Sequence, residues 1–303
     1  MHPLYIISGI SASGKSTLGQ FLVKSNFIDG IKYIDEDEFY LKDKPSVTLS
    51  NGEIVSNWDC LEAINPRFTE VVGDALKSSP VLLTGFALPA TLLPVAAAVH
   101  IHLVTADNPV DLEMRCRLAR TISKPLNNSE RDALMIREVV IPFYHRMVRE
   151  SDISHIMPVF DKDSRFPIDM LASVAKSIIR MAEITRERHH FMEVQEPYYS
   201  LIAKGIKPVE GRKISSKSLK IRRGDHITMV CGDNPSFNME VTGVTMYLPN
   251  IGDPLTEYLI TETLARTLPG ISTVEEGRKI YLQWSTEEEI MKMGMMGIQV
   301  QCL

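Results

Sequence analysis

The stretch Gly9-Ile10-Ser11-Ala12-Ser13-Gly14-Lys15-Ser16-Thr17 decides the fold of this chain. It contains two glycines that are separated by four residues and followed by Lys-Ser, which is the phosphate-binding loop pattern. The apolar run Leu4–Ile7 before it is typical of a buried strand, and Leu18–Lys24 after it can form a helix with one apolar face. A strand, a glycine-rich turn and a helix in this order indicate that the chain binds nucleotides.

The chemistry of polyphosphate binding explains this spacing. Glycines let the backbone approach a polyphosphate closely, and the N–H groups at the start of a helix supply positive potential. We expect Lys15 to reach the β- and γ-phosphates of ATP as a catalytic cation, and Ser16 to bind Mg²⁺ through its hydroxyl. The predicted ATP-binding residues are Gly9, Ser11, Ala12, Ser13, Gly14, Lys15, Ser16 and Thr17.

Composition limits the class of protein. A chain of 303 residues is long enough for two domains, and an apolar fraction of 44% without a run of membrane length predicts no membrane association. The N-terminal residues carry no secretion signal and the four cysteines are scattered, so we expect a cytoplasmic protein with reduced thiols. With 38 acidic and 33 basic residues, any contact with nucleic acid needs a local basic patch.

Strand and helix patterns alternate over the first 185 residues. Strands are expected at Lys32–Ile34, Pro80–Gly85, Ala97–Leu103 and His155–Val159. Helices are expected from Pro66 to Lys77, from Pro109 onward, from Ser129 to about Arg149, and from about Pro167 to Arg188. This alternation predicts an α/β fold in which a parallel sheet is covered by helices on both faces.

Four consecutive acids, Asp35-Glu36-Asp37-Glu38, follow the second expected strand. One interpretation is a solvated turn, because several adjacent carboxylates are costly to bury. The other is a functional site, because ligands of open α/β sheets bind beyond the carboxyl ends of the strands. One of these acids could accept a proton from an attacking hydroxyl, and another could help to hold the metal.

Residues 1–185 resemble the uridine kinase and nicotinamide riboside kinase branch of the P-loop kinases. The matching segments are Gly9–Thr17, Asp37–Tyr40, Asn57–Asp59 with Ala63, an Arg-rich lid region, Ile141–Tyr144 and Ser151–Ile153. The resemblance implies an ATP- and Mg²⁺-dependent kinase that phosphorylates a hydroxyl of a nucleoside-like substrate.

The resemblance also implies roles for individual residues. Asp37 corresponds to the general base of the family, and Asp59 and Tyr40 to substrate-binding residues. Arg117 and Arg120 correspond to lid arginines that neutralise the transferring phosphoryl group, although a solvated helix face would also account for them.

One position departs from the pattern of the family. Thr84 stands where these kinases usually have a glutamate before the glycine that ends the third strand, a residue that helps to hold the metal. Asp35 is therefore expected to hold Mg²⁺ together with Ser16, the alternative being weak metal binding.

The sequence changes character after residue 185. Short strand patterns separated by Gly, Asp, Asn and Pro turns predict a small β-barrel with one helix over about Pro254–Leu268. The segment Arg186–His190 has the composition of a junction, and its two histidines have no further clustered donors for a metal. We expect a first domain over 1–185, a linker over 186–192 and a second domain over 193–303.

Residues 193–303 resemble the ASCH domain, whose barrel is related to the PUA and YTH folds. The matching residues are Gly-x-Lys-x-x-Glu-x-Arg at 205–212, Pro197–Ile202 before it, Arg223-Gly224-Asp225 after it, and the ending Glu287–Val300. The resemblance implies binding of RNA or a modified base in a cleft formed by Lys207, Glu210 and Arg212. Hydrolysis is disfavoured, because the ASCH amidohydrolases use a threonine where this chain has Glu210.

A basic run over 212–223, with Lys217, Lys220, Arg222 and Arg223, could bind single-stranded nucleic acid or form a solvated hairpin.

The sequence as a whole leaves three functions open. The chain is a kinase for a small nucleoside-like acceptor, a kinase for a hydroxyl within nucleic acid, or an RNA-binding protein whose first domain only senses ATP.

Overall fold

The computed structural model describes residues 1–86, 88–104, 129–159, 167–184, 188–249 and 252–303. They form two compact units, of which the first contains Met1–Ile153 and Ile168–Lys176, and the second contains Ser154–Pro167 and Ser177–Leu303. The boundary falls within helix α6 (Ile168–Ile184), so the second unit begins earlier than the sequence predicts. Arg188, expected at the end of this helix, is not helical.

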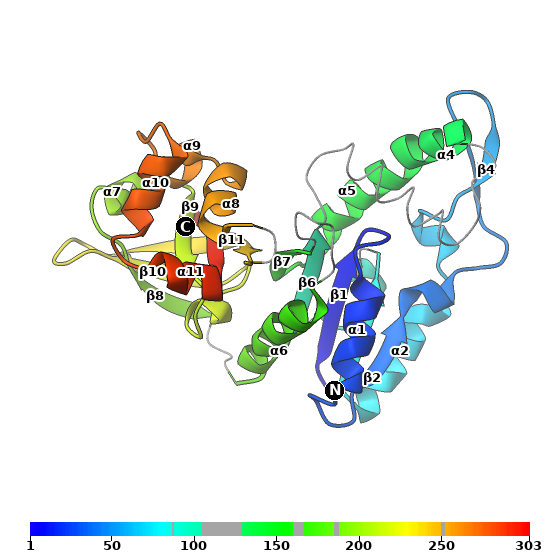
Figure 1. Ribbon diagram of the computed structural model, residues 1–303. Coiled ribbons are helices and arrows are strands. Elements are labelled where there is room, and N and C mark those ends of the chain that lie inside the picture. Colours follow the sequence, from blue (N-terminus) through cyan, green and yellow to red (C-terminus); the bar gives the residue numbers. More distant parts are fainter. Residues whose placement is uncertain (87, 105–128, 160–166, 185–187, 250–251) are drawn as a thin grey trace. The chain divides into compact units, whose positions relative to one another are not determined.

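The first unit is built on a parallel sheet (Figure 1). Its strands lie in the order β2 (Lys32–Asp35), β5 (Val81–Gly85), β1 (Leu4–Gly9) and β6 (Val99–Val104). Every residue of β1 and β5 is buried, which requires cover on both faces and explains the continuous apolar runs in the sequence. The α/β prediction is confirmed for this unit.

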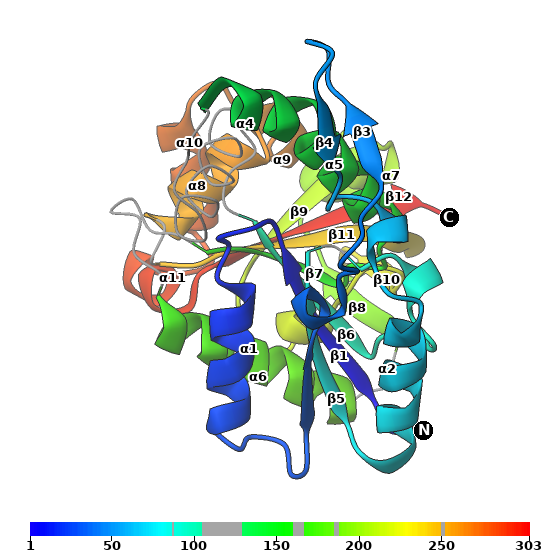
Figure 2. The same cartoon turned by 90° about the vertical axis from the view of Figure 1, so that its right-hand side faces the viewer.

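Helices α1 (Lys15–Lys24) and α2 (Arg67–Ser78) lie on opposite sides of these strands (Figure 2). In α2 the buried residues Phe68, Val72 and Leu76 recur at helical spacing, and they pack with the apolar side chains of β1 and β5 in one core cluster. The helix is therefore held by its apolar face rather than by its exposed residues.

The first unit also contains a two-stranded hairpin and a long helix. The hairpin consists of β3 (Ser46–Thr48) and β4 (Ile54–Ser56), which pair in antiparallel fashion. The helix predicted from Ser129 to about Arg149 is confirmed and contains α4 (Ser129–Met135), a π-helical turn (Ile136–Val140) and α5 (Ile141–Glu150). Short 3₁₀ turns occur at Glu36–Phe39, Leu61–Ala63 and Ala90–Leu92.

A mixed sheet forms the second unit. Its strands lie in the order β9 (Val209–Lys213), β12 (Met295–Cys302), β11 (Phe237–Tyr247), β10 (His226–Val230) and β8 (His189–Glu193), and β7 (His155–Pro158) also pairs with β11. In the described part of the chain no ladder joins β8 to β9, so the sheet is open and the predicted barrel closure is not found.

Two further expectations for this unit need correction. Residues 189–192, predicted as linker, belong to strand β8, because they pair along β10 from His189 to Glu193. The single helix expected over 254–268 is broken into α8 (Pro254–Thr261) and α9 (Leu264–Thr267), because Thr263 has a φ of 64° that a helix cannot contain.

Three other helices complete the second unit: α7 (Tyr198–Ala203), α10 (Val274–Tyr281) and α11 (Glu287–Met293). Helices α10 and α11 each begin with a capping box, formed by Thr273 with Glu276 and by Thr286 with Glu289. Among the described residues, no helix is long and apolar enough to cross a membrane.

Candidate functional sites

Strand β1 and helix α1 present the loop Gly9–Thr17 at the carboxyl end of the parallel sheet. Gly14 precedes the helix with a φ of 82°, a conformation that glycine adopts without steric cost. Lys15 begins α1 and is buried, with a relative exposure of 7%. The local fold is therefore the strand, turn and helix that the sequence predicts.

The loop has features that fit an anionic ligand. The N-cap residue Gly14 offers no capping side chain to the first turn of α1, so the N–H groups of this turn are not capped from within the described helix. The Ser13 hydroxyl oxygen is fully buried and has no hydrogen-bond partner among the described residues. Backbone N–H groups at a helix start, the Lys15 cation and this hydroxyl suit the phosphates of a nucleotide.

The two predicted metal ligands have a common neighbour, Tyr33. The Tyr33 hydroxyl donates to Asp35 Oδ2 at 2.9 Å and lies 2.8 Å from Thr84 Oγ1. Burial, together with the charge of Asp35, raises the pKa of Tyr33 to about 12, and a hydrogen bond from Ser16 acts in the opposite direction. Asp35 and Ser16 are thus brought to the same side of the phosphate loop, and Thr84 supports them through Tyr33.

The sequence did not single out Glu36, which is the most deeply buried member of the acidic run, with a relative exposure of 2%. Its Oε2 accepts a hydrogen bond of 2.7 Å from the backbone N–H of Phe86, just after β5. Burial raises the pKa of Glu36 to about 7, and the charge of Lys15 partly opposes that rise. No spacing rule identifies which of four consecutive acids turns inward.

Asp37, Asp59 and Tyr40 come together beside this carboxylate. Asp37 is exposed on the 3₁₀ turn after β2, and Asp35 Oδ1 accepts a hydrogen bond from its backbone N–H at 3.2 Å. Burial raises the pKa of Tyr40, and the charges of Glu36, Asp37 and Asp59 raise it further. The structure therefore places the predicted base near both predicted substrate-binding residues.

An aromatic surface adjoins this acidic cluster. The rings of Tyr40 and Trp58 lie with their centroids 5.9 Å apart, and 45% of Trp58 is exposed. Lys44 Nζ lies 3.3 Å from the centre of the Trp58 ring, a cation–π contact. The predicted lid arginines, Arg117 and Arg120, lie outside the described residues.

A buried hydrogen-bond network that no sequence pattern predicts lies directly before the loop. Ser8 Oγ lies 2.7 Å from His100 Nε2 and 2.8 Å from His102 Nδ1, and His102 Nε2 lies 2.7 Å from the Tyr144 hydroxyl. Burial lowers the pKa of His100 to about 3 and that of His102 to about 4. Both imidazoles are therefore neutral, and the network joins β1, β6 and α5.

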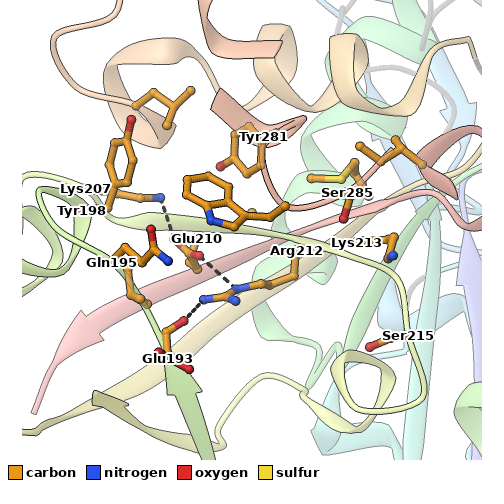
Figure 3. Close-up of a pocket in the computed structure, with 16 residues that line it drawn as sticks. Glu193, Gln195, Tyr198, Lys207, Glu210, Arg212, Lys213, Ser215, Tyr281 and Ser285 are labelled. Carbon is orange, nitrogen blue, oxygen red and sulfur yellow. Dashed lines mark hydrogen bonds and ion pairs between the residues drawn. The ribbon is translucent and has the colours of Figure 1, made fainter. Parts of the chain in front are cut away.

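The second unit contains a cleft of about 380 Å³ (Figure 3). It is lined by polar side chains from β8, β9 and the loops beside them, and by the half-exposed indole of Trp284. The three predicted cleft residues, Lys207, Glu210 and Arg212, all line it. The structure thus brings these three residues together in one cleft.

Glu210 holds the two cations of the cleft in place. Its Oε2 lies 2.9 Å from Lys207 Nζ, and its Oε1 lies 3.0 Å from Arg212 Nε. Lys207 also donates to the carbonyl of Val209 at 2.5 Å, and Arg212 Nη2 donates to the carbonyl of Glu193 at 2.5 Å. Because both oxygens of Glu210 are engaged, the donors that remain for a ligand belong to Arg212 and Lys207.

The ionic contacts decide the charge state of this group. Burial acts to raise the pKa of Glu210, but Lys207 and Arg212 hold it below its usual range. Burial also lowers the pKa of Lys207, and Glu210 partly offsets this effect. One carboxylate between two cations leaves this group of three residues with a net positive charge, which suits ligands that present acceptor atoms.

Two tyrosines pack against strand β9 at Gly211, beside the cleft. The hydroxyls of Tyr258 and Tyr281 lie 2.9 Å apart, and each would come within 2.5 Å of a Cβ placed on Gly211. Only glycine fits between Glu210 and Arg212 at this point of β9. This contact explains the glycine within the motif.

The basic run is not a single free patch. Lys213 Nζ forms an ion pair of 3.0 Å with Glu289, whereas Lys217 and Arg223 are exposed. The backbone N–H of Arg222 donates to Asp225 Oδ2 at 3.1 Å in the turn before β10.

The chain thus contains an α/β unit, whose loop at Gly9–Thr17 has the phosphate-binding pattern, and a second unit with a cleft that contains two cations. No family model and no curated protein matches the sequence. Among solved structures, the chain is similar to hypothetical protein PH0355, with 32% identity over 38% of this chain and 99% of that protein, and a TM-score of 0.34. The name of PH0355 states no activity.

Two further solved structures are similar. Protein PF0455 from Pyrococcus furiosus is 30% identical over 38% of this chain and 97% of that one, with a TM-score of 0.32. A putative fructose transport system kinase from Silicibacter sp. TM1040 is 15% identical over 50% of this chain and 86% of that one, with a TM-score of 0.30.

Proposed function

We propose that the first unit is an ATP-dependent phosphotransferase that acts on a hydroxyl of a nucleoside-like acceptor. One observation carries this proposal: Lys15 at the start of α1 and the cluster of Asp37, Asp59 and Tyr40 lie at the carboxyl end of one parallel sheet. The loop fits a nucleotide through the uncapped α1 N-terminus and the unpartnered Ser13 hydroxyl.

Each group has a defined task in this reaction. Lys15 stabilises the charge that develops on the β- and γ-phosphates. Asp37 accepts the proton of the acceptor hydroxyl as its oxygen forms a bond to the γ-phosphorus, while the bond from that phosphorus to the β-phosphate oxygen breaks and ADP leaves. Ser16 and Asp35 would hold Mg²⁺, which neutralises phosphate charge when bound.

Charge favours a nucleoside over a nucleic acid as the acceptor. Three carboxylates, Glu36, Asp37 and Asp59, raise the pKa of Tyr40 and so lie close to it. An acceptor within a polynucleotide would bring phosphates next to these carboxylates, and like charges repel at this range. A neutral sugar with free hydroxyls meets no such repulsion, and it can donate hydrogen bonds to Asp59.

Incubation with γ-labelled ATP and Mg²⁺ tests the proposal. Parallel pools of nucleosides and of oligonucleotides are added to the full chain, and label is followed into each pool. Label in nucleosides supports the proposal, and label in oligonucleotides supports a kinase for nucleic acid. ATP binding without transfer to either pool would support the alternative, in which the first unit only senses ATP.

We infer a separate binding function for the second unit. The donors of Lys207 and Arg212 and the exposed face of Trp284 suit the acceptor-bearing edge and the flat face of a nucleobase. Titration of the full chain with single nucleosides, followed by the fluorescence of Trp284, tests this function. A Trp284→Phe variant provides the control, because Trp58 remains as the other tryptophan.

A further inference from the structure

Strand β8 carries an exposed row of rings that neither proposed activity uses. Phe191 is 78% exposed, which is unusual for a phenylalanine on a strand, and the ring of His189 lies 5.6 Å from it. The adjacent strand β10 contributes His226, which is paired with His189 in the register and has its ring 6.5 Å from that of His189. These three residues, called here the ring face, lie on one face of the β8–β10 pair.

The hydrogen bonds of His189 fix the geometry of this face. His189 Nε2 lies 2.6 Å from Thr228 Oγ1, and the Thr228 hydroxyl donates to Asn238 Oδ1 at 2.7 Å. Since Thr228 uses its proton for Asn238, it accepts from Nε2 of His189. The imidazole is therefore held in place while its other edge remains exposed.

The ring face continues into the cleft. Residues at every second position of a strand share a face, so His189, Phe191 and Glu193 form one row along β8. Glu193 lines the cleft, and its carbonyl accepts a hydrogen bond from Arg212 (Figure 3). A ligand in the cleft thus lies beside Glu193, at one end of this row. Phe191 is the next residue of the row, about 6.6 Å from Glu193 along the strand.

Positive charge lies at the other end of the row. Strands β8 and β10 are parallel, so both begin at the same end, where the backbone N–H of His226 donates to the carbonyl of Arg188 at 2.8 Å. Arg188 and Arg223 are exposed at this end, and Arg212 lies at the cleft end. The row thus has cations at both ends, with rings and the Glu193 carboxylate between them; its cations and rings suit a chain with negative charges and flat bases.

From this arrangement we propose that the ring face binds the nucleotides that flank a base held in the cleft, so that the ligand of the second unit is a single-stranded nucleic acid. Phe191 and the exposed imidazoles stack on bases, and Arg188 and Arg223 contact phosphates. This inference rests on the proposed function of the cleft and extends it from one base to a strand.

Binding of single nucleosides and of decamers to the full chain tests the inference. The probes are the four ribonucleosides and labelled ten-residue homopolymers of RNA and of DNA, without ATP. We expect a decamer to bind more tightly than its nucleoside. Phe191→Ala should weaken decamer binding by about fivefold to a hundredfold, because one stacked base is lost, and should leave nucleoside binding unchanged.

Ile260→Ala is the matched control, since Ile260 is an exposed apolar residue of the same unit (58%) on helix α8. Equal affinities for decamer and nucleoside would overturn the inference while leaving the cleft function intact. Absence of any nucleoside or decamer binding would remove both. A change in the sedimentation of the free protein on Phe191→Ala would also overturn the inference, because the ring face would then join two copies of the chain.

Discussion

The carboxylate of Glu36 accepts a hydrogen bond of 2.7 Å from the backbone N–H of Phe86, and this bond ties the acidic turn after β2 to the end of β5. The bond holds Glu36, the first residue of the 3₁₀ turn that carries Asp37. It also leaves a carboxyl group buried close to Lys15, where its charge acts on the phosphate loop. The acidic turn that carries Asp37 is thus supported by a buried residue, Glu36.

Substitution of Glu36 by glutamine should stabilise the protein at neutral pH. The pKa of Glu36 in the folded protein, about 7, lies above its ordinary value of 4.5, so ionisation costs folding free energy progressively as pH rises from 4.5 to 7. Glu36→Gln keeps an acceptor for Phe86 and does not titrate. Its unfolding free energy should exceed that of the wild type by up to about 3 kcal/mol at pH 7, and by little at pH 4.5. Urea unfolding at the two pH values measures this difference between the variant and the wild type. A difference in unfolding free energy that does not depend on pH would contradict the prediction.

Loss of the Lys15 ammonium should abolish phosphoryl transfer. Electrostatic stabilisation provides most of this chemistry, so Lys15→Ala should lower the rate by a factor of about 10³ or more. Lys24→Ala is the matched control, because Lys24 is an exposed lysine in the last turn of the same helix. Initial rates with labelled ATP provide the measurement. Unchanged turnover in Lys15→Ala would refute the kinase proposal.

Asp37 and Asp35 should differ in their effects. Asp37→Asn removes the proton acceptor and should lower the rate by a factor of about 10² to 10⁴ with little change in ATP affinity. Asp35→Asn should instead raise the Mg²⁺ concentration needed for half-maximal rate. Glu38→Gln, at an exposed position of the same turn, should behave as the wild type. Exchange of the two phenotypes would reverse the roles of Asp35 and Asp37.

Acid should destabilise the first unit through His102. The pKa of His102 falls from 6.5 to about 4 on folding because the imidazole is buried. Its contribution to the free energy of unfolding is therefore complete above pH 6.5 and is lost as pH falls toward 4. His102→Gln can keep bonds to Ser8 and Tyr144 without titrating. The stability of the wild type relative to this variant should fall by about 1.4 kcal/mol per pH unit below 6.5. Unfolding curves at pH 7, 6 and 5 test this, with His226→Gln as an exposed control.

Removal of the Glu210 charge should lower the stability of the folded protein, and not only the affinity of the cleft for its ligand. Glu210→Gln leaves the buried Lys207 ammonium without its counter-ion, which costs about 3–5 kcal/mol. Adding Lys207→Met should recover part of this loss. Glu240→Gln is the control, because Glu240 accepts a hydrogen bond from Gln301 at the exposed surface of the sheet. Denaturant unfolding is measured for the wild type, Glu210→Gln, Lys207→Met, the double variant and the Glu240→Gln control. Additive effects of the substitutions at Glu210 and Lys207 would refute a coupled pair.

The sequence by itself determined the parts of this protein that depend on local pattern. Continuous apolar runs predict the buried parallel strands β1 and β5, and the two glycines with Lys15 predict the turn between β1 and α1. The motif at 205–212 places Lys207, Glu210 and Arg212 on and beside one short strand, where their spacing alone brings them together. These features need only neighbouring residues and the geometry of one element.

Tertiary structure alone decided the rest, because it depends on contacts between residues far apart in the chain. Glu36 turns inward because Phe86, fifty residues later, offers it a backbone N–H. His189 and His190 form a strand because β10 supplies their backbone partners, although their composition is that of a linker. Periodicity and spacing carry no information on such pairings, since a carboxylate or an imidazole is buried only where a distant partner repays the loss of water.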